Sequence, residues 1–455
     1  MALRIGLLFL AVFLVWLPPA MAQDLPISQQ LPPVAASTHR VDVGQLPVLD
    51  TTPEFNPEAA TTQWLARLPQ DLRTRSDDYT QGGHMLKIVN LVYGLGVAAL
   101  LLWFQISARI RDWTEERTRS RTYQAMLYGV IIVTTIAILT LPLSIYESYV
   151  REHAYGLSNQ SFMQWAGDFA ILFTTVVVAS VIFLPLFYAA IRATREIWWL
   201  SAAGLSIVAM VVGLAIYPVA IAPLFHNYTP LPDSAQTQPL LSLARANGVP
   251  AARLWVSDES TQSARLSANV TGFLGTTRII LSDNLLRQGT PDEVLAAMGR
   301  EIGHYEMGHI LRMALLFGLV LIAGFGLTAI VFRFATGLFG GNWQVRQPDD
   351  VAGFPLIAAL MGIFLFLFTP VTSSIVRSTE READLFGVNA VRKPDAFASL
   401  VLKKSGTRKL DPGFTEETIY FDHPSGKSRI AMMMRWKAEH LRDLDVRDSV
   451  RDSPH

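Results

Sequence analysis

The sequence predicts a mainly α-helical, polytopic membrane protein that also carries a small α+β soluble unit. Composition is the first observation, because 51% of the 455 residues are hydrophobic and only 17% are charged, below the quarter usual for a soluble domain. The second is a series of uninterrupted apolar runs of roughly 20 residues, the helix length that crosses a bilayer. The third is a region between two of these runs that has the pattern of strands and turns.

Charge and cysteine content exclude several classes of function. Lys plus Arg and Asp plus Glu both number 38, so no charge excess points to nucleic acid, and we expect no nucleic-acid partner. The chain has no cysteine, which excludes disulfides, thiol catalysis, iron–sulfur clusters and cysteine-type zinc sites. The absence of cysteine does not decide the cellular compartment, because an exported protein need not carry disulfides.

The N-terminus has the form of an export signal. Arg4 supplies one positive charge, an apolar stretch follows, and an Ala-x-Ala site ends at Ala22. We therefore expect 1–22 to be a cleaved signal peptide; an uncleaved first membrane helix is the alternative. The residues at 23–60 are rich in Pro, Gln, Thr and Ala, so we expect 23–87 to be an exported linker and N-terminal segment.

Six apolar runs after the signal peptide predict about six membrane helices. At 1.5 Å per residue, each is long enough to cross about 30 Å of hydrocarbon. Four form a membrane region at 88–225 and two form another at 313–375. The runs lie at about 88–107, 127–146, 169–191, 199–225, 313–333 and 353–375.

Arginines are concentrated in two of the connections between these runs. The connection 108–126 carries five and the turn 192–198 carries two, whereas 147–168 carries one. The positive-inside rule places the first two connections in the cytoplasm. The soluble unit at 226–312 and the helical region at 376–455 then share the periplasmic face of a bacterial-type inner (plasma) membrane.

The soluble unit begins with turns and ends with a strongly marked helix. Its pattern predicts a helix at 238–247, strands at 253–256 and 278–281, and a helix from 291 to about 311. Thr290 at the N-cap and Glu293 three residues on form a capping box for the last helix. We expect that helix to run nearly without a break into the fifth span, which places it at the membrane surface.

This last helix carries Arg300-Glu301-Ile302-Gly303-His304, one residue short of the signature H-E-x-x-H. The signature places two imidazoles one turn apart on one helix face, with a carboxylate that activates a metal-bound water. Glu301 and His304 fit it, but Arg300 occupies the first position. Taken alone, a Glu-x-x-His pair is more often a solvated helix surface than a catalytic site.

Two later segments carry residues that would suit the same site. Glu380 and Asp384 are one helical turn apart, so one could bind a metal while the other orients a neighbouring imidazole; an acidic helix surface is the alternative. His423 and Arg429 follow in a loop, where they could stabilise a tetrahedral oxyanion; a loop that starts a helix is the alternative.

In order and spacing, these segments resemble the type I CAAX prenyl protease family of membrane zinc metalloendopeptidases. The likeness covers roughly 85–430 and includes the spans, the segment around Asn269, the motif helix, Arg-x-x-Glu-x-x-Ala-Asp at 377–384, and His423-Pro424 with Arg429. The resemblance implies a zincin-like soluble unit in which a substrate strand lies along the Asn269 segment.

The resemblance also implies a role for each site residue. Glu301 would be the general base, and His304 and Glu380 would be ligands of Zn²⁺. Asp384 would stand behind these ligands, and His423 and Arg429 would contact the substrate or the transition state.

Arg300 departs from the family, which has the first zinc-binding His at this position. A guanidinium stays protonated and offers no lone pair, and a catalytic zinc normally has three protein ligands. His309 would point elsewhere on a continuous helix, because five residues correspond to about 140°. His226 or His423 could supply a ligand only through the tertiary fold.

Two functions remain open. The first is a membrane zinc metalloendopeptidase that acts on a peptide or membrane-protein substrate in the lipid bilayer. The alternative is a metal-free pseudoprotease, in which Arg300 pairs with Glu301, Glu380 and Asp384 and replaces the lost cation. A transporter is disfavoured, because few charged residues fall inside the spans.

Overall fold

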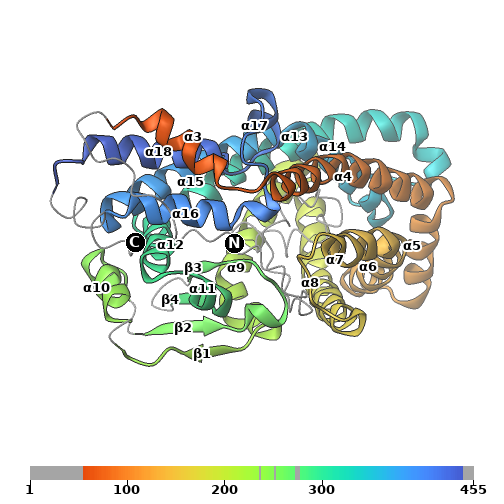
Figure 1. Cartoon of the computed structure of the whole chain (residues 1–455). Helices are drawn as coiled ribbons and strands as arrows, with labels where there is room; N and C mark the ends of the chain where they lie inside the picture. The colour runs from red at the N-terminus through yellow and green to blue at the C-terminus, as the bar shows by residue number, and fades with distance from the viewer. Residues whose placement is uncertain (1–54, 235–236, 251–252, 272–276, 444–455) are drawn as a thin grey trace.

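The computed structural model describes residues 55–234, 237–250, 253–271 and 277–443. The expected signal peptide at 1–22 lies outside these residues. The sheet and the helices α10–α12 lie at one end of the elongated molecule, and α5 (Ile106–Arg117) lies at the other, with long helices between them (Figure 1).

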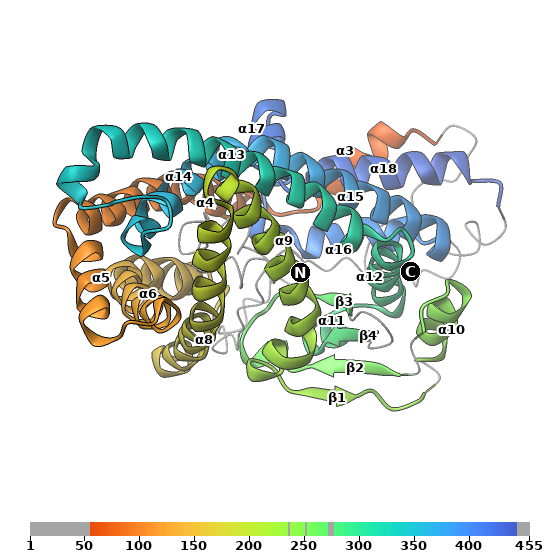
Figure 2. The same cartoon turned by 180° about the vertical axis from the view of Figure 1, so that it is seen from behind.

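Long apolar helices form the body of the molecule. They are α4 (Gln70–Trp103), α6 (Arg121–Ile145), α8 (Phe162–Thr194), α9 (Trp198–Ile216), α13 (His309–Trp343), α14 (Phe354–Leu367) and α15 (Thr369–Val391). In the described part of the chain, four helical stretches are long and apolar enough to cross a membrane, or five if the pair α14–α15, bent by 58°, forms one span. The stretch Phe162–Leu224 contains both α8 and α9, which pack against each other, so it covers two predicted runs (Figure 2).

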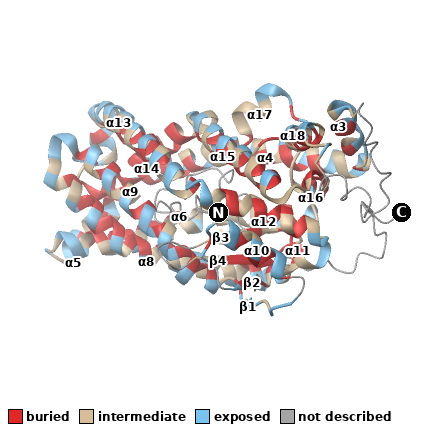
Figure 3. Cartoon of the chain, turned by 90° about the vertical axis from the view of Figure 1, so that its left-hand side faces the viewer, coloured by how far each residue is buried: buried red, intermediate tan, exposed pale blue. Residues whose placement is uncertain are grey.

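Short irregular helices connect the long ones. The segment after α6 continues as a π-helix at Tyr146–Val150 and as α7 (Arg151–Ala154), and α8 joins α9 through a 3₁₀ turn at Arg195–Ile197. Apolar side chains from α4, α6, α8, α9, α13 and α14 form one core. Helix α14 is buried along nearly its whole length (Figure 3).

A four-stranded sheet forms the soluble unit, in the order β1-β2-β4-β3. Its strands are β1 (Tyr228–Pro230), β2 (Leu254–Ser257), β3 (Ala268–Thr271) and β4 (Arg278–Ser282), followed by α11 (Asp283–Gln288). The strands β2 and β4 are parallel, and the other two pairs are antiparallel. The two central strands and α10 (Gln238–Ala246) match the prediction. The sequence pattern does not predict β1 and β3, because they are short edge strands with one mainly polar face.

The helix that carries the motif ends earlier than the sequence indicates. Helix α12 (Pro291–Glu306) begins with the expected capping box between Thr290 and Glu293. It does not continue to residue 311, because Gly308 adopts a left-handed φ of 62° and the membrane helix α13 starts anew at His309. A glycine at this position ends a helix without steric cost and turns the chain into a new direction.

The C-terminal region forms three helices, α16 (Pro394–Lys403), α17 (Phe414–Tyr420) and α18 (Gly426–Glu439). Helix α3 (Pro57–Ala66), from the other end of the described chain, packs against α18. Trp64 of α3 is buried in a core shared with Phe397, Met433 and Trp436. The two ends of the described chain are therefore held together beside the soluble unit.

Candidate functional site

The candidate site lies where α12 crosses α15. Glycines make this crossing close: a Cβ on Gly387 would stand 2.9 Å from the backbone nitrogen of Arg300, and one on Gly299 would stand 2.5 Å from Val391. Because neither glycine has a side chain to hold the helices apart, Arg300 of α12 comes within contact distance of Glu380 on α15.

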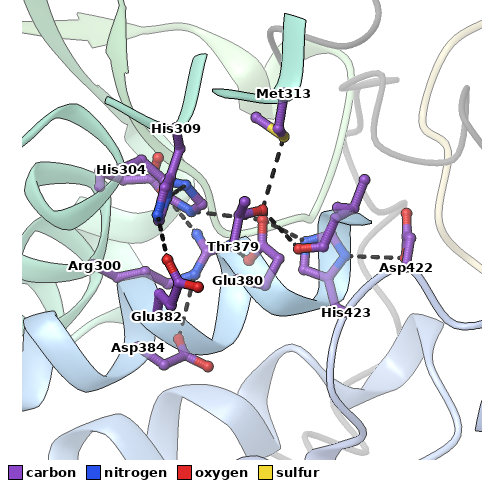
Figure 4. A network of polar contacts seen from close by, with 12 residues as sticks. Arg300, His304, His309, Met313, Thr379, Glu380, Glu382, Asp384, Asp422 and His423 are labelled. Carbon is purple, nitrogen blue, oxygen red and sulfur yellow. Dashed lines mark hydrogen bonds and ion pairs between the residues drawn. The ribbon is translucent and has the colours of Figure 1, made fainter. Parts of the chain in front are cut away.

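The guanidinium of Arg300 lies among three carboxylates (Figure 4). It donates hydrogen bonds to Glu301 and to Oε2 of Glu380, and its Nε lies 3.4 Å from Oδ1 of Asp384. Arg300 and Glu301 are each 15% exposed, and Asp384 is fully buried. Burial alone would lower the pKa of Arg300, but the charges of Glu380, Glu301 and Asp384 outweigh it and raise that pKa.

Asp384 has a second guanidinium partner. Arg429, in the first turn of α18, donates from Nε at 2.7 Å and from Nη2 at 2.6 Å to the two carboxylate oxygens of Asp384. This fork-to-fork geometry is the strong bidentate form of an arginine–carboxylate pair. Arg429 therefore holds Asp384 and ties α18 to α15. The alternative interpretation of Glu380 and Asp384 as an acidic surface is wrong, because both are buried.

Two imidazoles meet at the other oxygen of Glu380. Nε2 of His304 lies 3.5 Å from Oε1 of Glu380, and Nε2 of His423 lies 3.3 Å from the same atom. The other nitrogen of His423 is 3.0 Å from Oδ1 of Asp422, which is 3.3 Å from Arg408. Asp422 thus orients the His423 ring, a role that the sequence does not reveal.

His309 corrects the expectation that it points away from the motif. Its Nδ1 lies 3.0 Å from Nδ1 of His304, and its Nε2 lies 3.3 Å from Glu382, which also pairs with Arg312. The expectation assumed one continuous helix. The break at Gly308 changes the direction of the chain and returns His309, which is fully buried, to the His304 side.

Two further residues border the site without a signal in the sequence. Arg377 on α15 donates from Nη1 to the carbonyl oxygens of Glu417 at 2.8 Å and Phe421 at 2.6 Å, at the end of α17. Lys404 follows the last residue of α16. Burial, and next the charges of Arg300 and Arg429, lower the pKa of Lys404 to about 8. Only the folded chain brings these residues to the site.

The residues at the site do not fit a catalytic zinc. Among the residues that the structure describes, no group of three or more His, Cys, Asp or Glu could hold a metal ion. His304 and Glu380 are together, but the guanidinium of Arg300 takes Oε2 of Glu380 and cannot itself be a ligand. His226 does not substitute, since its nearest charged partner is Asp258, at 3.9 Å.

The fold and this cluster define a class of protein: a multi-pass helical membrane protein with a metallopeptidase-like site beside a small sheet. Two family models match the chain, "CAAX prenyl protease N-terminal, five membrane helices" at 52–227 and "Peptidase family M48" at 231–437. The chain belongs to the M48 family of membrane metalloproteases.

Relatives and a solved structure agree with this assignment. The chain is 27% identical to the uncharacterized metalloprotease YhfN of Bacillus subtilis, over 75% of this chain and 82% of that protein. It is 26% identical to CAAX prenyl protease 1 of Saccharomyces cerevisiae, over 69% of this chain and 73% of that protein. The crystal structure of S. mikatae Ste24p has the same fold, with a TM-score of 0.69 at 20% identity, covering 83% of this chain and 95% of that one.

Proposed function

We propose that this protein is a metal-free member of its family, which binds a peptide or a membrane-protein segment without hydrolysing it. The observation that carries the proposal is the position of Arg300, whose guanidinium contacts Glu301, Glu380 and Asp384. The positive charge of this guanidinium balances the carboxylates of the site, which would otherwise need a metal ion.

The edge of the sheet supplies a binding surface. Among the described residues, strand β3, which carries Asn269, pairs only with β4, so no described strand lies along its other edge. It also packs against α12, which places that edge next to the motif helix. An extended peptide could therefore add a strand to the sheet alongside Arg300 and His304. From the charge distribution of the connections, we place this surface on the periplasmic side of a bacterial inner membrane.

The second candidate is the activity of the family, a zinc metalloendopeptidase with Glu301 as general base. It is favoured by the cluster itself, because Glu380 lies next to His304 and His423, and Arg300 contacts both Glu380 and Glu301. This candidate requires the guanidinium of Arg300 to move away from Glu380. It also requires a further residue to serve as the third protein ligand of the zinc.

Zinc content separates the two candidates. Purified wild-type protein should hold far less than one zinc per chain, and Arg300→His should bind zinc and gain peptidase activity, because it restores the imidazole one turn before His304. Arg381→His is the matched control, since Arg381 is an exposed residue on α15. Stoichiometric zinc and peptide cleavage in the wild-type protein would refute the metal-free assignment.

Peptide binding is tested separately. A photo-crosslinking amino acid at Asn269 on β3 should capture extended peptides, whereas the same probe at Thr229 on β1 should not. Equal capture at both edges, or at neither, would refute the binding surface and leave the zinc result unaffected.

A further inference from the structure

A group of four arginines lies at two neighbouring helix connections, away from the M48 site. Arg119 and Arg121 stand at the start of α6, and Arg192 and Arg195 stand at the turn from α8 to α9. The fold brings the two connections together, because α6 packs against α8 and a Cβ on Gly129 would stand 3.0 Å from Leu184. We call these four residues the arginine patch.

The patch has little negative charge to balance it. Oδ2 of Asp349 lies 4.0 Å from Nη1 of Arg121, and Glu196 stands in the same turn as Arg195. Among the described residues, the guanidinium groups of Arg119, Arg192 and Arg195 have neither a hydrogen bond nor an ion pair. Arg192 is nevertheless partly buried, an environment that disfavours an unpaired cation unless an anion accompanies it.

Neighbouring arginines at the same end of the molecule show the contrast. Arg111 is paired with Asp350 at 2.6 Å and with Asp112 at 2.8 Å. Arg346 contacts Glu115 at 3.0 Å. The carboxylates of the chain match both of these guanidiniums.

Exposed apolar side chains lie on the membrane helix that ends at the patch. Val178, Ile182 and Leu186 are 56%, 54% and 53% exposed, and their spacing of four residues places them in one stripe on α8. Leu186, the last residue of the stripe, lies six residues before Arg192 on the same helix. Ile197, 54% exposed, is the last residue of the turn that carries Arg195.

We propose that the arginine patch binds the phosphate of an anionic phospholipid, whose acyl chains lie along the apolar stripe of α8. Guanidinium groups bind phosphate through paired, charge-assisted hydrogen bonds. A soluble anion would match the arginines but would make no use of the stripe. The charge of the patch and the stripe beside it together fit a lipid whose headgroup carries a net negative charge.

The test titrates detergent-purified full-length protein with dioctanoyl-phosphatidylglycerol, dioctanoyl-phosphatidylcholine and inorganic phosphate, followed by native mass spectrometry. Phosphatidylglycerol should saturate a site that the zwitterionic lipid fills much more weakly. The double variant Arg121→Gln/Arg192→Gln should bind phosphatidylglycerol about 25-fold more weakly, at roughly a fivefold loss for each arginine.

The control is Arg245→Gln/Arg435→Gln, which removes two exposed arginines outside the patch. It should bind both lipids as the wild-type protein does, and both double variants should keep the wild-type melting temperature. Equal binding of the two lipids, or unchanged binding by the patch variant, would overturn the proposal. Binding of inorganic phosphate as tight as that of phosphatidylglycerol would overturn the role of the stripe, and with it the assignment to a lipid.

Discussion

Arg300 is surrounded by three carboxylates, of which Asp384 has Arg429 as a second partner. Replacing it by Met would leave Glu301 and Glu380 without a guanidinium in a largely buried position. We expect Arg300→Met to lower the free energy of unfolding by about 3–5 kcal/mol, the usual effect of removing one partner from a buried ion pair. Thermal unfolding in detergent measures this, with Arg381→Met as an exposed control. Equal melting temperatures for the two variants would contradict it.

Lys404 should show an unusual pH dependence. The pKa of Lys404, about 8, lies below the value of about 10.4 for a free lysine. Below pH 8 the buried charged amine destabilises the folded state, and above pH 8 the loss of its proton removes this destabilisation. About half of the amine is neutral at pH 8. Lys403 is the internal comparison, since it is paired with Glu293 at 2.7 Å.

Pulse acetylation read by mass spectrometry checks the prediction for Lys404. At pH 8 Lys404 should be modified many-fold faster than Lys403, and its rate should level off between pH 8 and 9.5. A rate that keeps rising in proportion to hydroxide up to pH 10 would show an ordinary lysine.

At the scale of elements, α17 depends on polar contacts from α15. None of its residues is buried, and its last carbonyl groups accept hydrogen bonds from Arg377. A cation at a helix C-terminus stabilises that helix. We expect Arg377→Met to release α17 and the segment that leads to His423, which should raise hydrogen exchange at 414–423 at least tenfold. Arg377→Lys should restore part of the protection.

The helices and the site differ in how far the sequence predicts them. Short stretches of sequence predict the long apolar helices, whose length matches the thickness of the membrane. They also predict the capping box at Thr290 and the one-turn spacing of Glu380 and Asp384. The contacts between α12 and α15 are not, because they depend on glycines such as Gly387 that permit a close crossing. The sequence does not predict the position of His309, because a glycine in a helical pattern does not by itself reveal a left-handed φ.

At the scale of the whole molecule, the packing of α3 on α18 brings both ends of the described chain together, so we expect them on one side of the membrane. The chain has no cysteine, so single-cysteine variants report orientation without background. In intact cells an impermeant maleimide should label Glu439→Cys at the end of α18 and should not label Glu116→Cys on α5. Both positions should react after the membrane is opened. The reverse pattern would place the site in the cytoplasm.

A metal site exchanges its cation with the surrounding solution, so its charge depends on the supply of metal and on competing chelators. The guanidinium of Arg300 is attached to the chain and has no such exchange. The electrical balance of the cluster is therefore fixed when the polypeptide folds. It stays the same in a compartment from which zinc has been withdrawn, where a metal-dependent relative would lose its cation.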